Sequence, residues 1–93
     1  MANYHWLITY DFIDGGESKG VRGPRASRLT RSEIRRHGKS FRLLDDDGEL
    51  YYRGLYLGPD DETLFAPLDD FGMPNAGCTT IQYRNALGAW ESL

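Results

Sequence analysis

Six arginines between residues 22 and 36 could together neutralise several phosphate groups, because each guanidinium can pair with phosphate oxygens. A single acid, Glu33, lies among them, and they are Arg22, Arg25, Arg28, Arg31, Arg35 and Arg36. Nucleic-acid binding through this segment would weaken steeply with added salt. Two features argue against it: no aromatic side chain for stacking lies between Val21 and Ser40, and the isoelectric point of the chain is about 5.2.

Carboxylates form clusters in the second half of the chain, where they could imitate the phosphate backbone of a nucleic acid. They are Asp45, Asp46 and Asp47, then Asp60 and Asp61, and finally Asp69 and Asp70, which Phe71 follows. The partner would then be a protein that normally binds nucleic acid. Aromatic residues such as Phe71 would anchor the contact if they are exposed. The alternative is that these acids lie in turns and keep the surface hydrated.

The net charge of −3 hides a strong segregation along the chain. Residues 1–18 carry −3, residues 19–42 carry +8 and residues 43–93 carry −8. The arginines could therefore pair with the acids inside the monomer, or both patches could face outward as a charged docking surface for a protein. We favour these two interpretations over direct nucleic-acid binding, because the pattern contains little that could read bases.

Common catalytic and metal-binding motifs fail when their spacing is tested. The chain has no GxGxxG and no GxxxxGK motif, and "DDDGE" lacks the acid that a calcium loop needs, since Leu43 stands at that position. His5, His37 and Cys78 are far apart in sequence, and a buried thiol is the simpler interpretation of Cys78. We expect no catalytic residue, no metal site and no cofactor, and hence a protein that is not an enzyme.

The elements that carry these charges can be predicted from local patterns. Residues 4–12 alternate large apolar and polar side chains, which predicts a strand with one apolar face. A short strand near residues 20–22 would complete a hairpin that ends at Pro24. Thr30 and Glu33 fit a capping box and Gly38 a helix end, so a helix of about two turns should lie between them.

The remaining chain is expected to form hairpins around one long connection. Asp47-Gly48 is a strong turn signal between two strands, although the sequence leaves the register open. If the loop comprises residues 45–48, one face carries Phe41, Leu43, Leu50, Tyr52 and Tyr56. Residues 58–77 mix glycine, proline and acids, with a possible strand at residues 63–66. Residues 78–93 then form a final hairpin.

These patterns predict a single α+β domain over residues 1–93. The sheet is mainly antiparallel, with about five strands in hairpins and one short α-helix. The core should comprise Trp6, Ile8, Tyr10, Phe12, Ile34, Phe41, Leu43, Tyr52, Ile81, Tyr83 and Trp90. No apolar run is long enough to span a bilayer, "MANYHW" does not resemble a secretory signal, and one cysteine requires no oxidising compartment. A cytosolic protein without membrane association is expected.

In "LFAPLDDFGMPNAGCTTIQYRN", and in the preceding "DDDGELYYRGLY", the chain resembles small accessory proteins of phages, plasmids and integrative elements. Such proteins include inhibitors of host defence, the anti-CRISPR type among them, and the resemblance implies stoichiometric binding without assigning a role to any residue. The leading hypothesis is a binding module that docks on a protein partner through its segregated charges, as an accessory or inhibitor of a nucleic-acid-handling complex. The second is a nucleic-acid-binding protein that uses residues 22–36, and the third is a small enzyme. The oligomeric state stays open.

Overall fold

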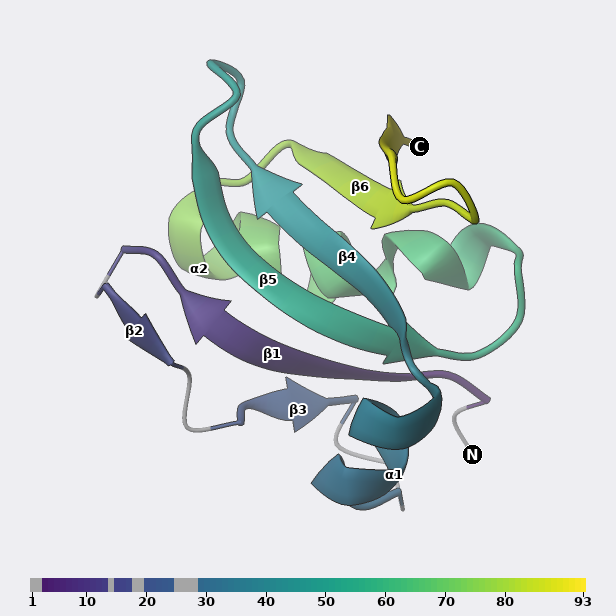
Figure 1. Cartoon of the computed structure of the whole chain (residues 1–93). Helices are drawn as coiled ribbons and strands as arrows, with labels where there is room; N and C mark the ends of the chain where they lie inside the picture. Colours follow the sequence, from purple (N-terminus) through teal and green to yellow (C-terminus); the bar gives the residue numbers. More distant parts are fainter. Residues whose placement is uncertain (1–2, 14, 18–19, 25–28) are drawn as a thin grey trace.

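The computed structural model describes residues 3–13, 15–17, 20–24 and 29–93, which form one antiparallel sheet and two helical segments (Figure 1). The sheet order is β2-β1-β5-β4-β6-β7, and β3 also pairs with β1. The strands are β1 (His5–Asp11), β2 (Gly16–Glu17), β3 (Arg22–Gly23), β4 (Lys39–Leu44), β5 (Leu50–Leu57), β6 (Thr80–Arg84) and β7 (Trp90–Ser92). The predicted α+β class is confirmed. No helix in the described ranges is long and apolar enough to cross a membrane.

The main core lies between one face of the sheet and the helical segment 62–76 (Figure 1). Alternate residues of the central strands point into it, so that Trp6 lies opposite Tyr56 and Leu43 lies opposite Tyr52. Eight of the predicted core residues are buried: Trp6, Ile8, Ile34, Phe41, Leu43, Tyr52, Ile81 and Tyr83. The register between β4 and β5 places Phe41, Leu43, Tyr52 and Tyr56 on the same face, as a loop of residues 45–48 predicts. The same prediction is wrong for Leu50, because the register shifts after Leu43, so Leu50 lies opposite Leu44 and is not part of the core cluster.

A β-bulge in β1 overturns the prediction that Tyr10 and Phe12 belong to the core. Ile8 lies opposite Gly54, but Tyr10 lies opposite Arg53, so Thr9 is an extra residue in the ladder. One extra residue moves every following side chain to the other face of the strand. Tyr10 is therefore half-buried beside Arg53, and Phe12 is 38% exposed. Alternation in the sequence alone cannot reveal such an insertion.

Trp90 was also expected in the core, and this prediction is wrong. It lies opposite Arg84 in the short final strand β7, at the end of the sheet, and is only half-buried. Its ring contacts the guanidinium of Arg42, which belongs to the face of the sheet opposite the core. The three-residue strand β7 pairs only with β6, so it offers this large ring no second apolar layer.

Helix α1 (Arg31–His37) forms as the capping box predicts. Thr30 accepts a hydrogen bond from the Glu33 backbone N–H at 3.2 Å, and the Glu33 carboxylate accepts one from the Thr30 N–H at 3.4 Å. Ile34 is fully buried against the sheet. Gly38 ends the helix in an extended conformation, and a Cβ there would lie 2.5 Å from the Ile34 carbonyl and 2.8 Å from Leu55 Cβ. Glycine is thus required because the helix end touches β5.

The long connection contains a second helical segment instead of the possible strand at residues 63–66. A 3-10 turn (Glu62–Phe65), a π turn (Leu68–Gly72) and α2 (Met73–Ala76) follow one another. The Asp61 side chain accepts from the Thr63 N–H at 2.8 Å and starts the first turn. Leu64, Leu68 and Phe71 pack against the core. Their spacing of four and three residues is helical, but the prolines and glycines around them obscure this signal.

Candidate functional site

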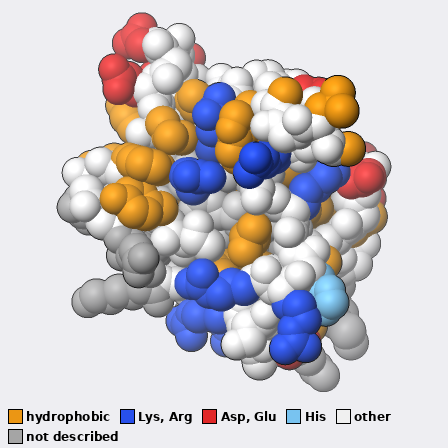
Figure 2. Space-filling model, in the orientation of Figure 1, with side chains coloured by type: hydrophobic (Ala, Val, Ile, Leu, Met, Phe, Trp, Pro, Cys, Tyr) orange, Lys and Arg blue, Asp and Glu red, His pale blue; other side chains and the backbone are white. Residues whose placement is uncertain are grey.

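The face of the sheet opposite the core is covered by α1 at one end and is open elsewhere (Figure 1). Four arginines and two aromatic residues gather there, and we call them the basic face: Tyr10, Arg35, Arg42, Arg53, Arg84 and Trp90. Figure 2 shows this side of the molecule, with Lys and Arg side chains around its middle and acidic side chains at its margins. The surface is therefore positive even though the whole chain is negative.

A polar row crosses the open face at right angles to the strands. Its members are paired from strand to strand as Tyr10, Arg53, Arg42, Gln82 and Ser92. Arg42 Nε donates to Gln82 Oε1 at 2.6 Å, and Gln82 Nε2 donates to Ser92 Oγ at 3.0 Å. Five neighbouring strands give the row a length of about 19 Å. It can therefore offer several donors along one line to an extended anionic ligand.

The indole of Trp90 is held by two guanidinium groups. The Cζ atoms of Arg42 and Arg53 lie 4.5 and 5.9 Å from the centroid of the ring, distances at which a cation is attracted to an aromatic face. At the other end of the row, the rings of Tyr10 and Phe12 are 4.4 Å apart. Aromatic rings thus stand at both ends of the central arginine pair, which is the combination that the sequence of residues 22–36 lacks.

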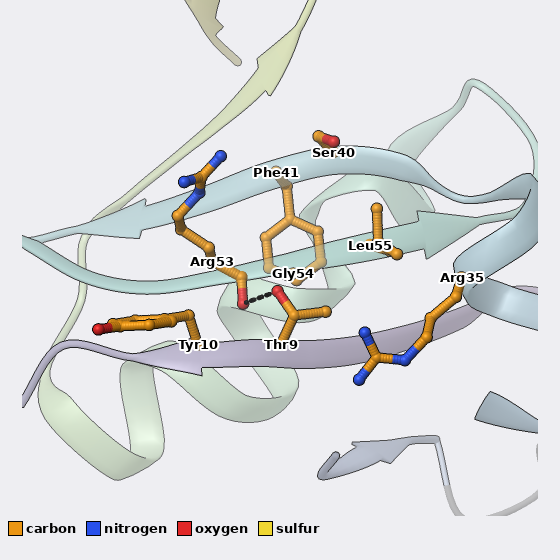
Figure 3. A pocket seen from close by; sticks show the side chains of 8 residues that line it. All are labelled: Thr9, Tyr10, Arg35, Ser40, Phe41, Arg53, Gly54 and Leu55. Atoms are coloured by element: carbon orange, nitrogen blue, oxygen red, sulfur yellow. Dashed lines mark hydrogen bonds between the residues drawn. The ribbon is translucent and has the colours of Figure 1, made fainter. Parts of the chain in front are cut away.

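A groove of about 340 Å³ separates this row from α1 (Figure 3). Arg35 reaches into it from the helix, Thr9 and Tyr10 line it from β1, Ser40 from β4, and Arg53 from β5. The Thr9 hydroxyl donates to the Arg53 carbonyl at 3.3 Å, which secures the bulge at the edge of the groove. Gly54 and Phe41 also line the groove.

The charge of the groove and of the row is not compensated locally. Every charged side chain that lines the groove is an arginine. Between described residues the one ion pair joins Lys39 Nζ to Asp60 Oδ1 at 3.1 Å, with both side chains well exposed. The internal pairing of arginines with aspartates, considered above, is therefore not observed in the described part of the chain. Arg35, Arg53 and Arg84 leave their charge available to a ligand.

The six arginines predicted as a basic patch have different positions. Arg22 donates to the Leu29 carbonyl, and Arg31 Nε donates to the Gly20 carbonyl at 2.7 Å, so both tie together the segment before α1. Arg35 and Arg36 are exposed on α1, but only Arg35 lines the groove. Arg25 and Arg28 lie outside the described residues. Of the six predicted arginines, Arg35 therefore belongs to the basic face. The sequence had placed the basic patch at residues 22–36 instead.

The predicted acidic patch is divided among separate regions. Asp45, Asp46 and Asp47 form the turn between β4 and β5, which projects from the body of the molecule (Figure 1). Asp60 and Asp61 lie beyond the opposite end of β5, and Asp69 and Asp70 lie in the π turn. Phe71 is half-buried, with its ring centroid 5.5 Å from that of Trp6 and 4.9 Å from that of Tyr52.

Several of these carboxylates stabilise the fold. Asp45 accepts hydrogen bonds at 2.9 Å from the backbone N–H groups of Asp47 and Glu49 and from the Tyr51 hydroxyl. The bond from Glu49 is the main cause that lowers the pKa of Asp45, and the same carboxylate raises the pKa of Tyr51. Asp70 accepts from the Trp6 indole at 3.2 Å. Only some of the predicted acidic side chains are therefore left for a partner.

The histidine and cysteine side chains considered as metal ligands do not form a second site in the described part of the chain. Cys78 is fully buried, and burial raises the pKa of its thiol to about 11. Burial also lowers the pKa of His5. Across the described ranges, no three His, Cys, Asp or Glu side chains are grouped as a metal ion would need. Comparison of the chain with protein-family models, with curated proteins and with solved structures gives no match.

Sequence reasoning missed five members of the basic face: Tyr10, Arg42, Arg53, Arg84 and Trp90. Tyr10 and Trp90 were assigned to the core, and Arg53 and Arg84 were counted only as the two bases of an acidic half. One signal was present, because Arg42, Arg53 and Arg84 each interrupt a strand at a position that alternates with apolar residues. Such a pattern indicates cations on one sheet face, although strand pairing decides which of them are neighbours.

Proposed function

We propose that this protein is a non-enzymatic module that binds single-stranded nucleic acid on the open face of its sheet. The observation that carries the proposal is the cluster of Arg42, Arg53 and Trp90, in which two guanidinium groups lie beside one indole ring on an uncovered sheet. Open sheets that bind single strands combine cations for the phosphates with aromatic rings for the bases. Arg35, Arg84 and Tyr10 extend the same combination across this face.

The uniform polarity and positive charge of the face favour nucleic acid over protein as the ligand. The centres of protein interfaces are largely apolar and depleted of Lys, Asp and Glu, although arginine and aromatic residues are enriched there. Here Arg42 and Arg53 lie in a row that is otherwise polar, and the Trp90 ring lies against these two arginines instead of forming an apolar centre. Nucleic-acid interfaces are polar and positively charged throughout. A row of about 19 Å suits a few nucleotides, at the low end of known site sizes.

The two tryptophans provide a direct test by NMR. Trp6 is buried with its indole N–H bonded to Asp70, whereas Trp90 lies on the basic face. Titration with an unstructured oligothymidine or oligouridine should shift the indole resonance of Trp90 and leave that of Trp6 in place. Binding of a labelled oligonucleotide should weaken steeply between 50 and 200 mM salt, and Arg42→Gln should weaken it by about fivefold or more.

Three results would refute the proposal. One is the absence of salt-sensitive binding to any single strand at 50 mM salt. Another is binding that leaves the Trp90 resonance unchanged, since the strand would then lie on another surface. A preference for a duplex of the same length would also contradict it, because the aromatic rings can stack only on bases that are unpaired.

A protein-docking module is the second candidate, and the projecting turn between β4 and β5 favours it. Asp46 and Asp47 are exposed there, while Asp45 holds the turn in shape (Figure 1). A rigid acidic projection could occupy a basic site of a nucleic-acid-handling protein, as the leading hypothesis from the sequence requires. Asp46→Lys with Asp47→Lys should then abolish a complex that resists nuclease treatment. The cytosolic location and the resemblance to accessory proteins of mobile elements stay predictions.

A further inference from the structure

We propose that the groove between α1 and β5 is a phosphate-binding subsite in which Arg35 binds the anion. Arg53, whose side chain extends toward β4, borders the subsite on the side of the polar row (Figure 3). This inference rests on the proposed function and assigns one step of it, the capture of a phosphate group of the strand. The shape of the groove, its charge and its donors each support the proposal.

The groove results from a departure from a regular sheet and from the position of α1. The bulge at Thr9 turns Tyr10 toward Arg53, so both residues border the groove. Gly54 lies opposite Phe41, and a Cβ on it would point to the core side, 2.3 Å from the Leu7 carbonyl and 2.4 Å from the Phe41 ring, so close packing excludes a larger residue beneath the groove. Helix α1 forms the opposite wall and carries Arg35 (Figure 3). The hollow of about 340 Å³ is therefore built into the fold.

The lining offers donors and positive charge to an anion. Arg35 comes from a helix, and Ser40 and Arg53 come from two different strands. The Thr9 hydroxyl is not among these donors, because it already donates to the Arg53 carbonyl. Donors from several directions suit the tetrahedral arrangement of phosphate oxygens, and guanidinium groups can bind two of these oxygens at once. No carboxylate lines the groove to compete for the arginines. The volume is near the lower limit of small-ligand sites, which fits one phosphate group with its sugar.

The position of the groove links it to the rest of the basic face. Arg53 belongs both to the groove and to the polar row, where its guanidinium lies 5.9 Å from the Trp90 ring centroid. A phosphate in the groove therefore places the next nucleotide above Arg53 and Arg42. The phosphate can belong to a phosphodiester within the strand or to a phosphorylated end, because both present the same oxygens to Arg35.

The test compares Arg35→Gln with Arg36→Gln, a matched control on the same helix. Both side chains are exposed and both substitutions remove one charge, but Arg36 does not line the groove. Inorganic phosphate is titrated at constant ionic strength while the resonances of the groove are followed by NMR. We expect shifts at Thr9, Ser40 and Gly54, and a loss of phosphate affinity of at least fivefold in Arg35→Gln. The control should bind phosphate as the wild type does.

Oligonucleotides then distinguish the source of the phosphate and separate the two proposals. Arg35→Gln should reduce the salt slope of single-strand binding by about 0.7, the value for one phosphate contact, and Arg36→Gln should leave it unchanged. A strand with a 5′ phosphate that binds more tightly than the unmodified strand would assign the groove to a phosphorylated end. Equal binding of the two strands would assign it to a phosphodiester.

Equal effects of the two substitutions would overturn the subsite, because general attraction by α1 would then explain them. Phosphate shifts that lie outside the groove would overturn it as well. A wild type that binds the strand while Arg35→Gln has an unchanged salt slope contradicts the subsite and leaves the proposed function intact. A wild type that binds inorganic phosphate in the groove but binds no single strand supports the subsite and contradicts the proposed function.

Discussion

Arg42 and Arg53 lie directly opposite each other on neighbouring strands, and their guanidinium carbons are 4.5 and 5.9 Å from the ring centroid of Trp90. Like charges in directly opposed positions of a sheet are destabilising. The aromatic ring offsets part of this repulsion, but no ion pair with a described acid does so. A pair that costs stability in the free protein is well suited to an anionic ligand, which would neutralise it.

Arg53→Gln should therefore separate stability from binding. Removal of one of two opposed charges is expected to leave the free energy of unfolding unchanged or to raise it by up to about 1 kcal/mol. Affinity for a single strand should fall at the same time, because Arg53 contributes to both the row and the groove. Urea unfolding and oligonucleotide binding of the same preparation measure the two effects. A clear loss of stability would show that Arg53 serves the fold rather than a ligand.

Gly54→Ala tests whether the core packs tightly against β5 beneath the groove. The added methyl group would meet the Leu7 carbonyl and the Phe41 ring, so the free energy of unfolding should fall by about 1–3 kcal/mol. Gly16→Ala is the matched control, since a Cβ there meets nothing within 4 Å. It should leave stability unchanged or raise it slightly. Similar unfolding midpoints for both variants in urea would contradict the packing argument.

Acid should weaken the turn between β4 and β5 through Asp45. Its carboxylate accepts hydrogen bonds from Glu49, Asp47 and Tyr51, and the first of these is the main cause of its lowered pKa. A lowered pKa in the folded state means that the carboxylate stabilises the protein above its unfolded value of about 3.8. This contribution is lost as the pH falls through the folded value.

Asp45→Asn measures that contribution. The variant should be less stable than the wild type at pH 7, and the difference should shrink as the pH is lowered below about 4. Urea unfolding at a series of pH values follows both proteins. A difference that stays constant with pH would mean that the charge of Asp45 has no part in holding the turn.

Cys78 should be unreactive in the folded protein. Its side chain is fully buried, and burial raises the pKa of the thiol to about 11, so almost no thiolate exists at pH 8. Labelling with a thiol-specific disulfide reagent should be slow without denaturant and rapid in concentrated urea. Fast labelling of the native protein would show that the segment between α2 and β6 opens readily.

The sequence by itself determined the local elements, because their signals depend on neighbours in the chain. The capping box of Thr30 and Glu33, the turn at Asp47-Gly48 and the alternation of Trp6 with Ile8 all correspond to observed structure. Each is a short-range preference of the backbone or of side-chain periodicity. The second helical segment was not predicted, because the prolines around Leu68 are typical of loops. In so short a stretch, this loop-like composition obscures the helical spacing of the apolar residues.

Only the tertiary structure decided where the candidate site lies. The extra residue at Thr9 moves both Tyr10 and Phe12 from the core face of the sheet to the open face. No local sequence pattern reveals this bulge, because a bulge is defined by the pairing with the partner strand. Arg42, Arg53 and Trp90 are distant in sequence, and strand pairing alone makes them neighbours. A linear count of charge placed the basic surface at residues 22–36, whereas the fold uses Arg22 and Arg31 to hold backbone carbonyls. Pairing between distant strands sets the chemistry of this surface, and that information is not local.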